Sequence, residues 1–181
     1  HQVDIQIRML LIEPRKNLLN TAKAFLRLIE EHPDLDVHLV ICGKKGWKFE
    51  ELFKEDLTQS KRIHFTGFVN DEDLPLLYAH ALALCYVSYY EGFGLPPLEA
   101  MSCGTPVIFG DNSSMPEVVG KGGLPAVADD VEAIKSQMHR LVADPVFREE
   151  LAREAWRQSR RFSWLKTTLQ TLEAYRKVIE R

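Results

Sequence analysis

Short, continuous apolar runs alternate with longer helical segments along this chain, and this alternation constrains the fold most. Strands that are apolar on both faces are typical of parallel sheets, which helices cover on each side. Parallel strands are joined by right-handed crossovers, so the pattern predicts an α/β fold: a Rossmann-like, doubly wound parallel sheet of about six strands. The predicted strands are Ile7–Ile12, Val37–Cys42, Ile63–Phe65, Leu82–Val87, Pro106–Phe109 and Leu124–Val127.

Helices are predicted between and after these strands. In Asn17–His32 the apolar residues return at helical spacing on one face. In "NDEDLPLLYAHA", Asn70 or Asp71 is the predicted N-cap, and Glu117 opens a short turn that ends in "GKGG". The last helix has few strongly apolar positions, so we predict a domain at 1–162 and a C-terminal helix at 163–181 that is not wholly part of its core. The other predicted helices are Phe49–Leu57, Leu95–Cys103, Val131–Val142, Pro145–Arg160 and Leu165–Ile179.

Composition excludes several function classes. The 181 residues carry a net charge of −3, which argues against a broad nucleic-acid-binding surface. No segment approaches the roughly 20 apolar residues of a membrane span, and the opening "HQVDIQIR" does not resemble a signal peptide. Cys42, Cys85 and Cys103 lie in apolar runs whose spacing fits neither zinc nor disulfide patterns. We therefore expect buried, reduced thiols in a cytoplasmic protein.

The loops at the carboxyl ends of the strands are where a sheet of this kind binds ligands. The first, "EPRKN", places Arg15 and Lys16 between a strand end and a helix start. Two cations beside a helix N-terminus suit a diphosphate, and taken alone the loop also fits a solvated charged turn. The second loop, "GKKGW" (Gly43–Trp47), repeats glycines and cations but is better explained as a surface turn.

The stretch "EGFGLPPLEAMSCGTPVI" follows the fourth predicted strand. Gly92 and Gly94 allow a ligand to approach the backbone closely, and the helix that begins at Leu95 offers N–H groups as a second anion contact. Glu91 precedes this turn, and Glu99 lies about one helical turn beyond it. A carboxylate in the position of Glu99 can accept hydrogen bonds from two neighbouring hydroxyls, as acidic residues do with ribose in dinucleotide folds.

Three explanations compete for the two acids. A hydrolase needs two carboxyl groups about 5–10 Å apart across one bond, and an anion-binding turn between them fits that poorly. A metal pair lacks a nearby His or Asp at ligand spacing. Taken singly, each acid could be a surface group or a helix-dipole partner. Together with the glycines at this sheet edge, they favour two functional acids on either side of a bound anion.

These loops, in this order, resemble the carboxyl-terminal domain of retaining glycosyltransferases of family 4, the glycosyl transferases group 1. The resemblance runs from about Ile7 to Trp164 and includes "IHFTGFVNDEDLPLLYAHA" and the Glu-seven-residues-Glu element with its internal Gly-x-Gly. It implies one half of a GT-B fold, in which two Rossmann-like domains face each other across a cleft. It also implies a nucleotide-sugar donor and no metal or other cofactor.

The resemblance assigns roles to matching positions. Arg15 and Lys16 would neutralise the donor diphosphate and stabilise it as the leaving group, and Glu91 would lie by the transferred sugar as a catalytic residue. Glu99 would hold the ribose hydroxyls. The remaining substrate-binding positions are Val69, at the base pocket, and Gly92, Phe93, Gly94 and Leu95, whose backbone would contact sugar and phosphate.

Two features depart from the family pattern. The family usually has a Gly-Thr pair before the "EPRKN" acid, where this chain reads "MLLIE". The amino-terminal domain that holds the acceptor is also absent, so the chain resembles a fragment whose last helix would cross to that missing partner.

The sequence therefore predicts the donor-binding half of a hexosyltransferase, with GDP-mannose preferred over UDP-sugars and a growing polysaccharide or lipid-linked glycan as acceptor. The isolated chain should bind nucleotide without turnover. The full-length enzyme would be cytoplasmic, with a peripheral position at the membrane allowed. The alternatives are a non-catalytic nucleotide-binding scaffold and a GT-B UDP-sugar epimerase, which the close match of "EGFGLPPLE" to the transferase loop disfavours.

Overall fold

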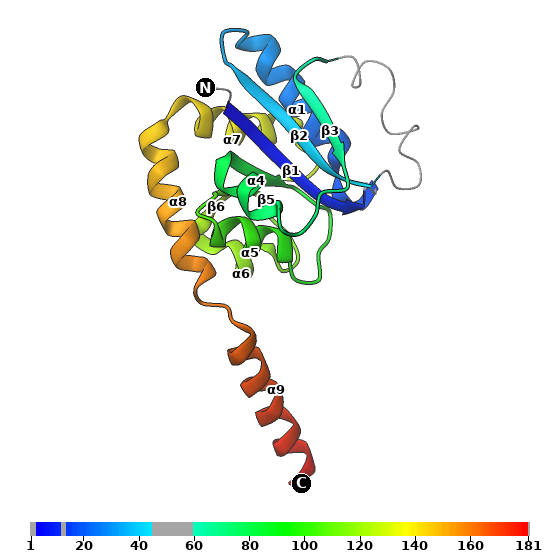
Figure 1. Ribbon diagram of the computed structural model, residues 1–181, viewed down its shortest axis with the longest axis vertical. Coiled ribbons are helices and arrows are strands. Elements are labelled where there is room, and N and C mark those ends of the chain that lie inside the picture. The colour runs from blue at the N-terminus through cyan, green and yellow to red at the C-terminus, as the bar shows by residue number, and fades with distance from the viewer. Residues whose placement is uncertain (1–2, 12–13, 45–59, 181) are drawn as a thin grey trace.

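The computed structural model describes residues 3–11, 14–44 and 60–180, and over these residues the chain forms an α/β domain (Figure 1). Its parallel sheet has six strands in the order β3-β2-β1-β4-β5-β6, the order of the doubly wound dinucleotide-binding fold. The predicted fold class is confirmed. The strands are β1 Val3–Leu11, β2 Val37–Lys44, β3 Ile63–Gly67, β4 Ala81–Tyr86, β5 Val107–Gly110 and β6 Gly123–Ala126.

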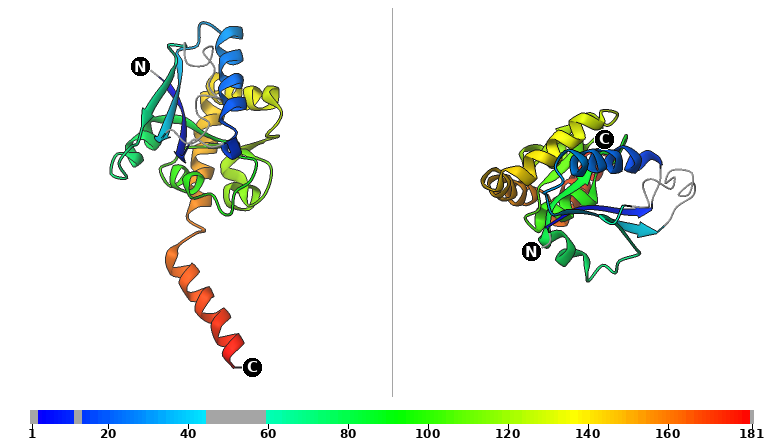
Figure 2. Two further views of the ribbon diagram at one scale, coloured as in Figure 1. Left: turned by 90° about the vertical axis from the view of Figure 1, so that its right-hand side faces the viewer. Right: turned by 90° about the horizontal axis from the view of Figure 1, so that it is seen from above.

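Helices cover both faces of the sheet (Figure 2). One hydrophobic cluster joins the sheet to α1 and α7, through residues such as Phe25 and Met138. The other joins it to α4, α5 and α6, through residues such as Tyr78, Met101 and Met115. The helices are α1 Leu18–Glu31, α4 Leu74–His80, α5 Leu95–Ser102, α6 Met115–Val119, α7 Val131–Ala143, α8 Pro145–Ser159 and α9 Trp164–Ile179, with 3₁₀ turns η1 Pro14–Lys16 and η2 Gly120–Gly122.

Strand β4 shows why the apolar runs are continuous. Cys85 belongs to the cluster under α1 and α7, whereas Leu84 and Tyr86 belong to the cluster under α4, α5 and α6. Because successive side chains of a strand point to opposite faces, a strand covered on both sides must be apolar throughout. β4 also pairs with β1. The strands β2 and β3 lie on one side of β1, and β4, β5 and β6 lie on its other side, so the strand order reverses between β1 and β4. The ligand crevice of such folds lies at this switch point.

Several predicted boundaries are wrong. β1 begins at Val3 instead of Ile7, and β2 continues to Lys44, so the start of "GKKGW" is strand. Residues 71–73 form a turn, and the N-cap of α4 is Asp73, which places Pro75 in the first turn of the helix, where proline is tolerated. The segment predicted as a turn at Glu117 is the short helix α6. The predicted helix Phe49–Leu57 and the rest of "GKKGW" lie outside the described residues.

The last helix, α9, has no buried residue and projects away from the domain (Figure 1). The division into a domain at 1–162 and a helix at 163–181, and the crossing of that helix to a second domain, stay predictions. The described part of the chain contains no helix that is both long and apolar enough to cross a membrane. None of the three cysteines forms a disulfide, and Cys42 and Cys85 are buried; the prediction was wrong for Cys103, which is half-buried.

Candidate functional site

Asn17 anchors the loop that follows β1. Its backbone is left-handed, with φ 55°, a conformation that asparagine tolerates better than most residues. Its buried Nδ2 donates to the carbonyl oxygens of Val87 at 3.0 Å and Ala128 at 2.6 Å. These bonds tie the loop to the carboxyl ends of β4 and β6. The neighbouring Arg15 and Lys16 are thereby held over the end of β4. Sequence reasoning did not single out Asn17.

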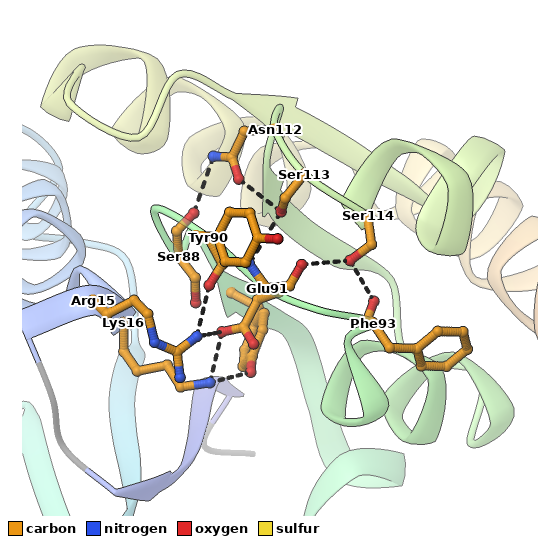
Figure 3. Close-up of polar contacts among 10 residues, drawn as sticks. Arg15, Lys16, Ser88, Tyr90, Glu91, Phe93, Asn112, Ser113 and Ser114 are labelled. Carbon is orange, nitrogen blue, oxygen red and sulfur yellow. Dashed lines mark hydrogen bonds and ion pairs between the residues drawn. The ribbon is translucent and has the colours of Figure 1, made fainter.

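Arg15, Lys16 and Glu91 form one charged cluster at this edge of the sheet (Figure 3). The Lys16 Nζ lies 2.6 Å from Glu91 Oε1 and donates to the hydroxyl of Tyr86 at 2.6 Å. The Arg15 Nη1 lies 3.2 Å from the same carboxylate oxygen and donates to the Tyr90 carbonyl at 2.6 Å. The side chains of Lys16 and Glu91 are only 12% and 10% exposed, whereas that of Arg15 is 43% exposed. The structure therefore brings the three predicted catalytic residues together.

The cluster determines how Glu91 and Tyr86 ionise. Burial alone would raise the pKa of Glu91, but the hydrogen bond from Lys16 and the charges of Lys16 and Arg15 outweigh burial and lower it. Burial, reinforced by the Glu91 charge, raises the pKa of Tyr86 far above its usual range. Glu91 is thus a carboxylate at neutral pH, and Tyr86 beside it is a neutral phenol.

Ser88 adds a buried hydroxyl beside this cluster. Its side chain lies next to the Glu91 carboxyl, and its hydroxyl adds to the effect of Lys16 and Arg15 in holding the pKa of Glu91 low (Figure 3).

The loop after β5 fixes the backbone around Glu91. Ser113 Oγ accepts a hydrogen bond from the Glu91 N–H at 3.1 Å, and Ser114 Oγ lies 3.0 Å from the Glu91 carbonyl and 2.9 Å from that of Phe93 (Figure 3). Asn112 Nδ2 donates to the Ser88 carbonyl at 3.1 Å. The sequence prediction did not name this loop among the site residues. Its signal was the polar "GDNSS" directly after a buried strand, at the same sheet edge.

The glycine turn has one position that only glycine fits well. Gly94 has φ +107°, and an added Cβ would lie 2.3 Å from the Met115 Cε. Gly92, by contrast, has open space around it. The turn also exposes Phe93 and Leu95. The start of α5 offers fewer anion contacts than predicted, because Pro96 and Pro97 have no N–H and only Leu95 among its first three residues carries one.

Glu99 belongs to the other end of the site. It is exposed, about one turn into α5, and its Oε2 accepts a hydrogen bond from the Tyr78 hydroxyl at 3.1 Å. Val69 is half-buried and packs against the cluster that contains Tyr78. Glu99 lines a cavity of about 400 Å³ with Phe93 and Leu95, and a second of about 320 Å³ with Tyr78. The two glutamates therefore have separate partners, Lys16 and Arg15 for one and Tyr78 for the other.

No metal-binding cluster of three or more His, Cys, Asp or Glu side chains occurs within residues 3–11, 14–44 and 60–180. The predicted roles of the individual residues remain predictions.

Comparison with known proteins agrees with this architecture. The sequence model described as "Glycosyl transferases group 1" matches residues 10–158. The O-antigen chain mannosyltransferase B of Escherichia coli is 41% identical over 167 residues, which are 91% of this chain and 44% of that protein. This chain thus spans less than half the length of that relative, and 41% of the MMP alpha-(1->4)-mannosyltransferase of Mycolicibacterium hassiacum, to which it is 35% identical over 93% of its own length.

A solved structure of similar extent also exists. The C-terminal domain of a glycosyl transferase group 1 family protein (LpcC) from Francisella tularensis superposes with a TM-score of 0.76 at 25% identity, covering 86% of this chain and 83% of that one.

Proposed function

This chain belongs to the glycosyl transferases group 1 family, and from that premise we propose that it is the nucleotide-sugar donor-binding domain of a retaining mannosyltransferase. Its fold is one Rossmann-like half of a GT-B enzyme, as in its structural neighbours. The observation that carries the proposal is the cluster of Arg15, Lys16 and Glu91 at the switch point of the sheet. It supplies charge for a diphosphate and a carboxylate for a sugar at one place.

The proposed chemistry follows from these charges. As the sugar leaves the donor, negative charge grows on the departing diphosphate, and preorganised cations stabilise it. Lys16 is held at this edge of the sheet by two hydrogen bonds, and it would exchange its bond to Glu91 for one to the diphosphate. Glu91 would accept hydrogen bonds from the sugar, and Glu99 from the ribose hydroxyls. We infer that Arg15 and Lys16 do the work of a divalent cation, so nucleotide binding should persist in a chelator.

The choice of mannose rests on the names of the relatives, which are mannosyltransferases of Escherichia coli and Mycolicibacterium hassiacum. GDP-mannose is accordingly the proposed donor. The acceptor, a growing polysaccharide or lipid-linked glycan, would be held by an amino-terminal domain that lies outside this chain. We therefore propose that the chain binds the donor but transfers no sugar by itself.

Calorimetry with GDP-mannose, GDP and guanosine tests the proposal, with the UDP series alongside. The double variant Arg15→Ala/Lys16→Ala should weaken GDP binding strongly and leave guanosine binding nearly unchanged, because only the diphosphate contacts these cations. Lys135→Ala, which removes an ion-paired lysine of α7, serves as the control. Equal losses for GDP and guanosine would refute the assignment of Arg15 and Lys16. No binding of either nucleotide series would refute the donor-binding proposal itself.

A further inference from the structure

Two buried tyrosines direct their hydroxyls out of the same hydrophobic cluster toward the two ends of the site. Tyr86 and Tyr78 are 1% and 3% exposed and belong to the cluster under α4, α5 and α6. The hydroxyl of Tyr86 meets Lys16, and the hydroxyl of Tyr78 meets Glu99. A buried phenol normally finds a polar partner. Here each partner is a residue proposed to contact the donor.

Tyr86 controls where the charge of Lys16 lies. The Lys16 ammonium has three N–H donors, and Tyr86 and Glu91 accept from it at 2.6 Å each. The ammonium also lies 4.8 Å from the centre of the Tyr86 ring, within range of a cation–π contact. Tyr86 ends β4 within the hydrogen-bonded sheet, so its ring is a rigid support. Without the Tyr86 hydroxyl, Lys16 would lose one of its two hydrogen bonds and keep the contact with the ring and the bond to Glu91.

Tyr78 controls the orientation of Glu99. Its ring is buried in α4, and its backbone carbonyl accepts a hydrogen bond from Thr105 Oγ1 at 2.6 Å. Its hydroxyl lies 3.1 Å from Glu99 Oε2. Glu99 is exposed, and an exposed glutamate side chain samples several rotamers. A hydrogen bond to one carboxylate oxygen favours the rotamer in which that bond forms.

We propose that Tyr86 and Tyr78 are positioning residues with separate tasks: Tyr86 places Lys16 for the diphosphate, and Tyr78 places Glu99 for the ribose hydroxyls. The inference rests on the proposed function, because it assigns supports to the groups that would bind the nucleotide. The two tasks are separable, since each hydroxyl contacts a residue at a different end of the site.

The test is a crossed comparison of Tyr86→Phe and Tyr78→Phe. Each removes one hydroxyl and keeps the buried ring. Calorimetry measures the affinities for GDP, guanosine and 2′-deoxy-GDP. Guanosine lacks the diphosphate and 2′-deoxy-GDP lacks one ribose hydroxyl, so the three affinities report on the two ends of the site separately. Tyr86→Phe should weaken GDP binding about tenfold, the effect of one hydrogen bond to a charged group, and leave guanosine binding unchanged. Tyr78→Phe should weaken GDP and guanosine by the same factor and reduce the preference for GDP over 2′-deoxy-GDP.

Tyr175→Phe, on the exposed helix α9, is the matched control and should change none of these affinities. Thermal unfolding without ligand confirms that each variant is folded. If both variants lose affinity for all three ligands by similar factors, or neither loses any, the positioning roles are refuted while the proposed function stands. If the wild-type chain binds neither these ligands nor their uridine counterparts, the proposed function fails, and the positioning roles fail with it.

Discussion

Replacing Lys16 by Met should reveal how strongly the buried carboxylate depends on its cation. The variant keeps an unbranched side chain, one atom shorter than lysine, and removes the ammonium 2.6 Å from Glu91. Removing one partner of a buried pair costs about 3–5 kcal/mol. Arg15 remains 3.2 Å from the same oxygen and offsets part of this, so we expect a loss of about 2–3 kcal/mol at pH 7. In a domain of this size that lowers the unfolding midpoint by roughly 5–10 °C.

The pH dependence gives the sharper signature. In the wild type the pKa of Glu91 is below its ordinary value of 4.5, so the ionised carboxylate adds stability above pH 4.5 that is lost as the pH falls through the folded pKa. Without Lys16, burial becomes the dominant influence and raises the pKa of Glu91. A raised pKa reverses the sign, because the folded state then binds the extra proton and stability falls as the pH rises through it.

Urea unfolding of both proteins between pH 4 and pH 7 measures this reversal. The difference in free energy of unfolding between the wild type and Lys16→Met should be smaller at pH 4 than at pH 7 by roughly half or more, because Glu91 of the variant is protonated at pH 4. Lys135→Met is the matched control: its ammonium lies 2.6 Å from Glu31 and 2.7 Å from Glu132, but those carboxylates are 50% and 55% exposed. That variant should lose far less stability than Lys16→Met, because exposed ion pairs contribute little. A Lys16→Met penalty that is the same at both pH values would refute the reasoning.

Three further outcomes follow from single contacts. Gly94→Ala should destabilise the domain by about 1–3 kcal/mol, since alanine would adopt a positive φ and displace the buried Met115; an unchanged urea midpoint would contradict this. Asn17→Ala leaves the buried Val87 carbonyl without the Asn17 donor and the Ala128 carbonyl with the longer bond from Asn20 and should cost about 2 kcal/mol in the same assay, whereas a loss below the error of the measurement would argue against the anchoring role. Burial raises the pKa of Cys85 to about 12, so iodoacetamide at pH 8 should alkylate the half-buried Cys103 first; equal labelling rates by mass spectrometry would disagree with the structure.

The elements that sequence reasoning placed well are those whose signals are local and redundant. β4 was predictable because a strand buried on both faces leaves a continuous apolar run, and α5 because Gly-x-Gly and prolines mark its start. The meeting of Lys16 and Glu91 at one sheet edge was also predictable, since carboxyl ends of parallel strands lie together. The start of α4 was harder, because Asn70, Asp71 and Asp73 are all plausible caps and only the turn before the helix selects the last.

The partners of the predicted residues could not be derived from the sequence. The bond between Lys16 and Tyr86 joins side chains 70 positions apart, and its formation depends on the register of β1 and β4. Likewise, nothing in the isolated "GDNSS" shows that its serines would bind the backbone of Glu91. The sequence also could not show that Lys16 and Glu91 neutralise each other. Charged side chains at the same edge of a sheet form an ion pair only if their charged groups come close enough, and the sequence does not give that distance.

That mutual neutralisation has a consequence for the proposed ligand. A bare diphosphate that draws Lys16 away leaves the Glu91 carboxylate, only 10% exposed, with Arg15 as its remaining cation. A sugar on the diphosphate would donate hydrogen bonds from its hydroxyls to the Glu91 carboxylate. Lys16 would then contact the diphosphate and Glu91 the sugar, so each member of the broken ion pair would have a new partner. We therefore expect this chain to bind GDP-mannose more tightly than GDP, although the sugar adds only neutral groups.

Glu91→Gln should reverse this order of affinities, because Lys16 then has no carboxylate partner and is available to GDP, while the sugar loses a charged acceptor. Calorimetry of both ligands on both proteins decides this, and an affinity ratio that the substitution leaves unchanged would show that Glu91 and the sugar do not meet.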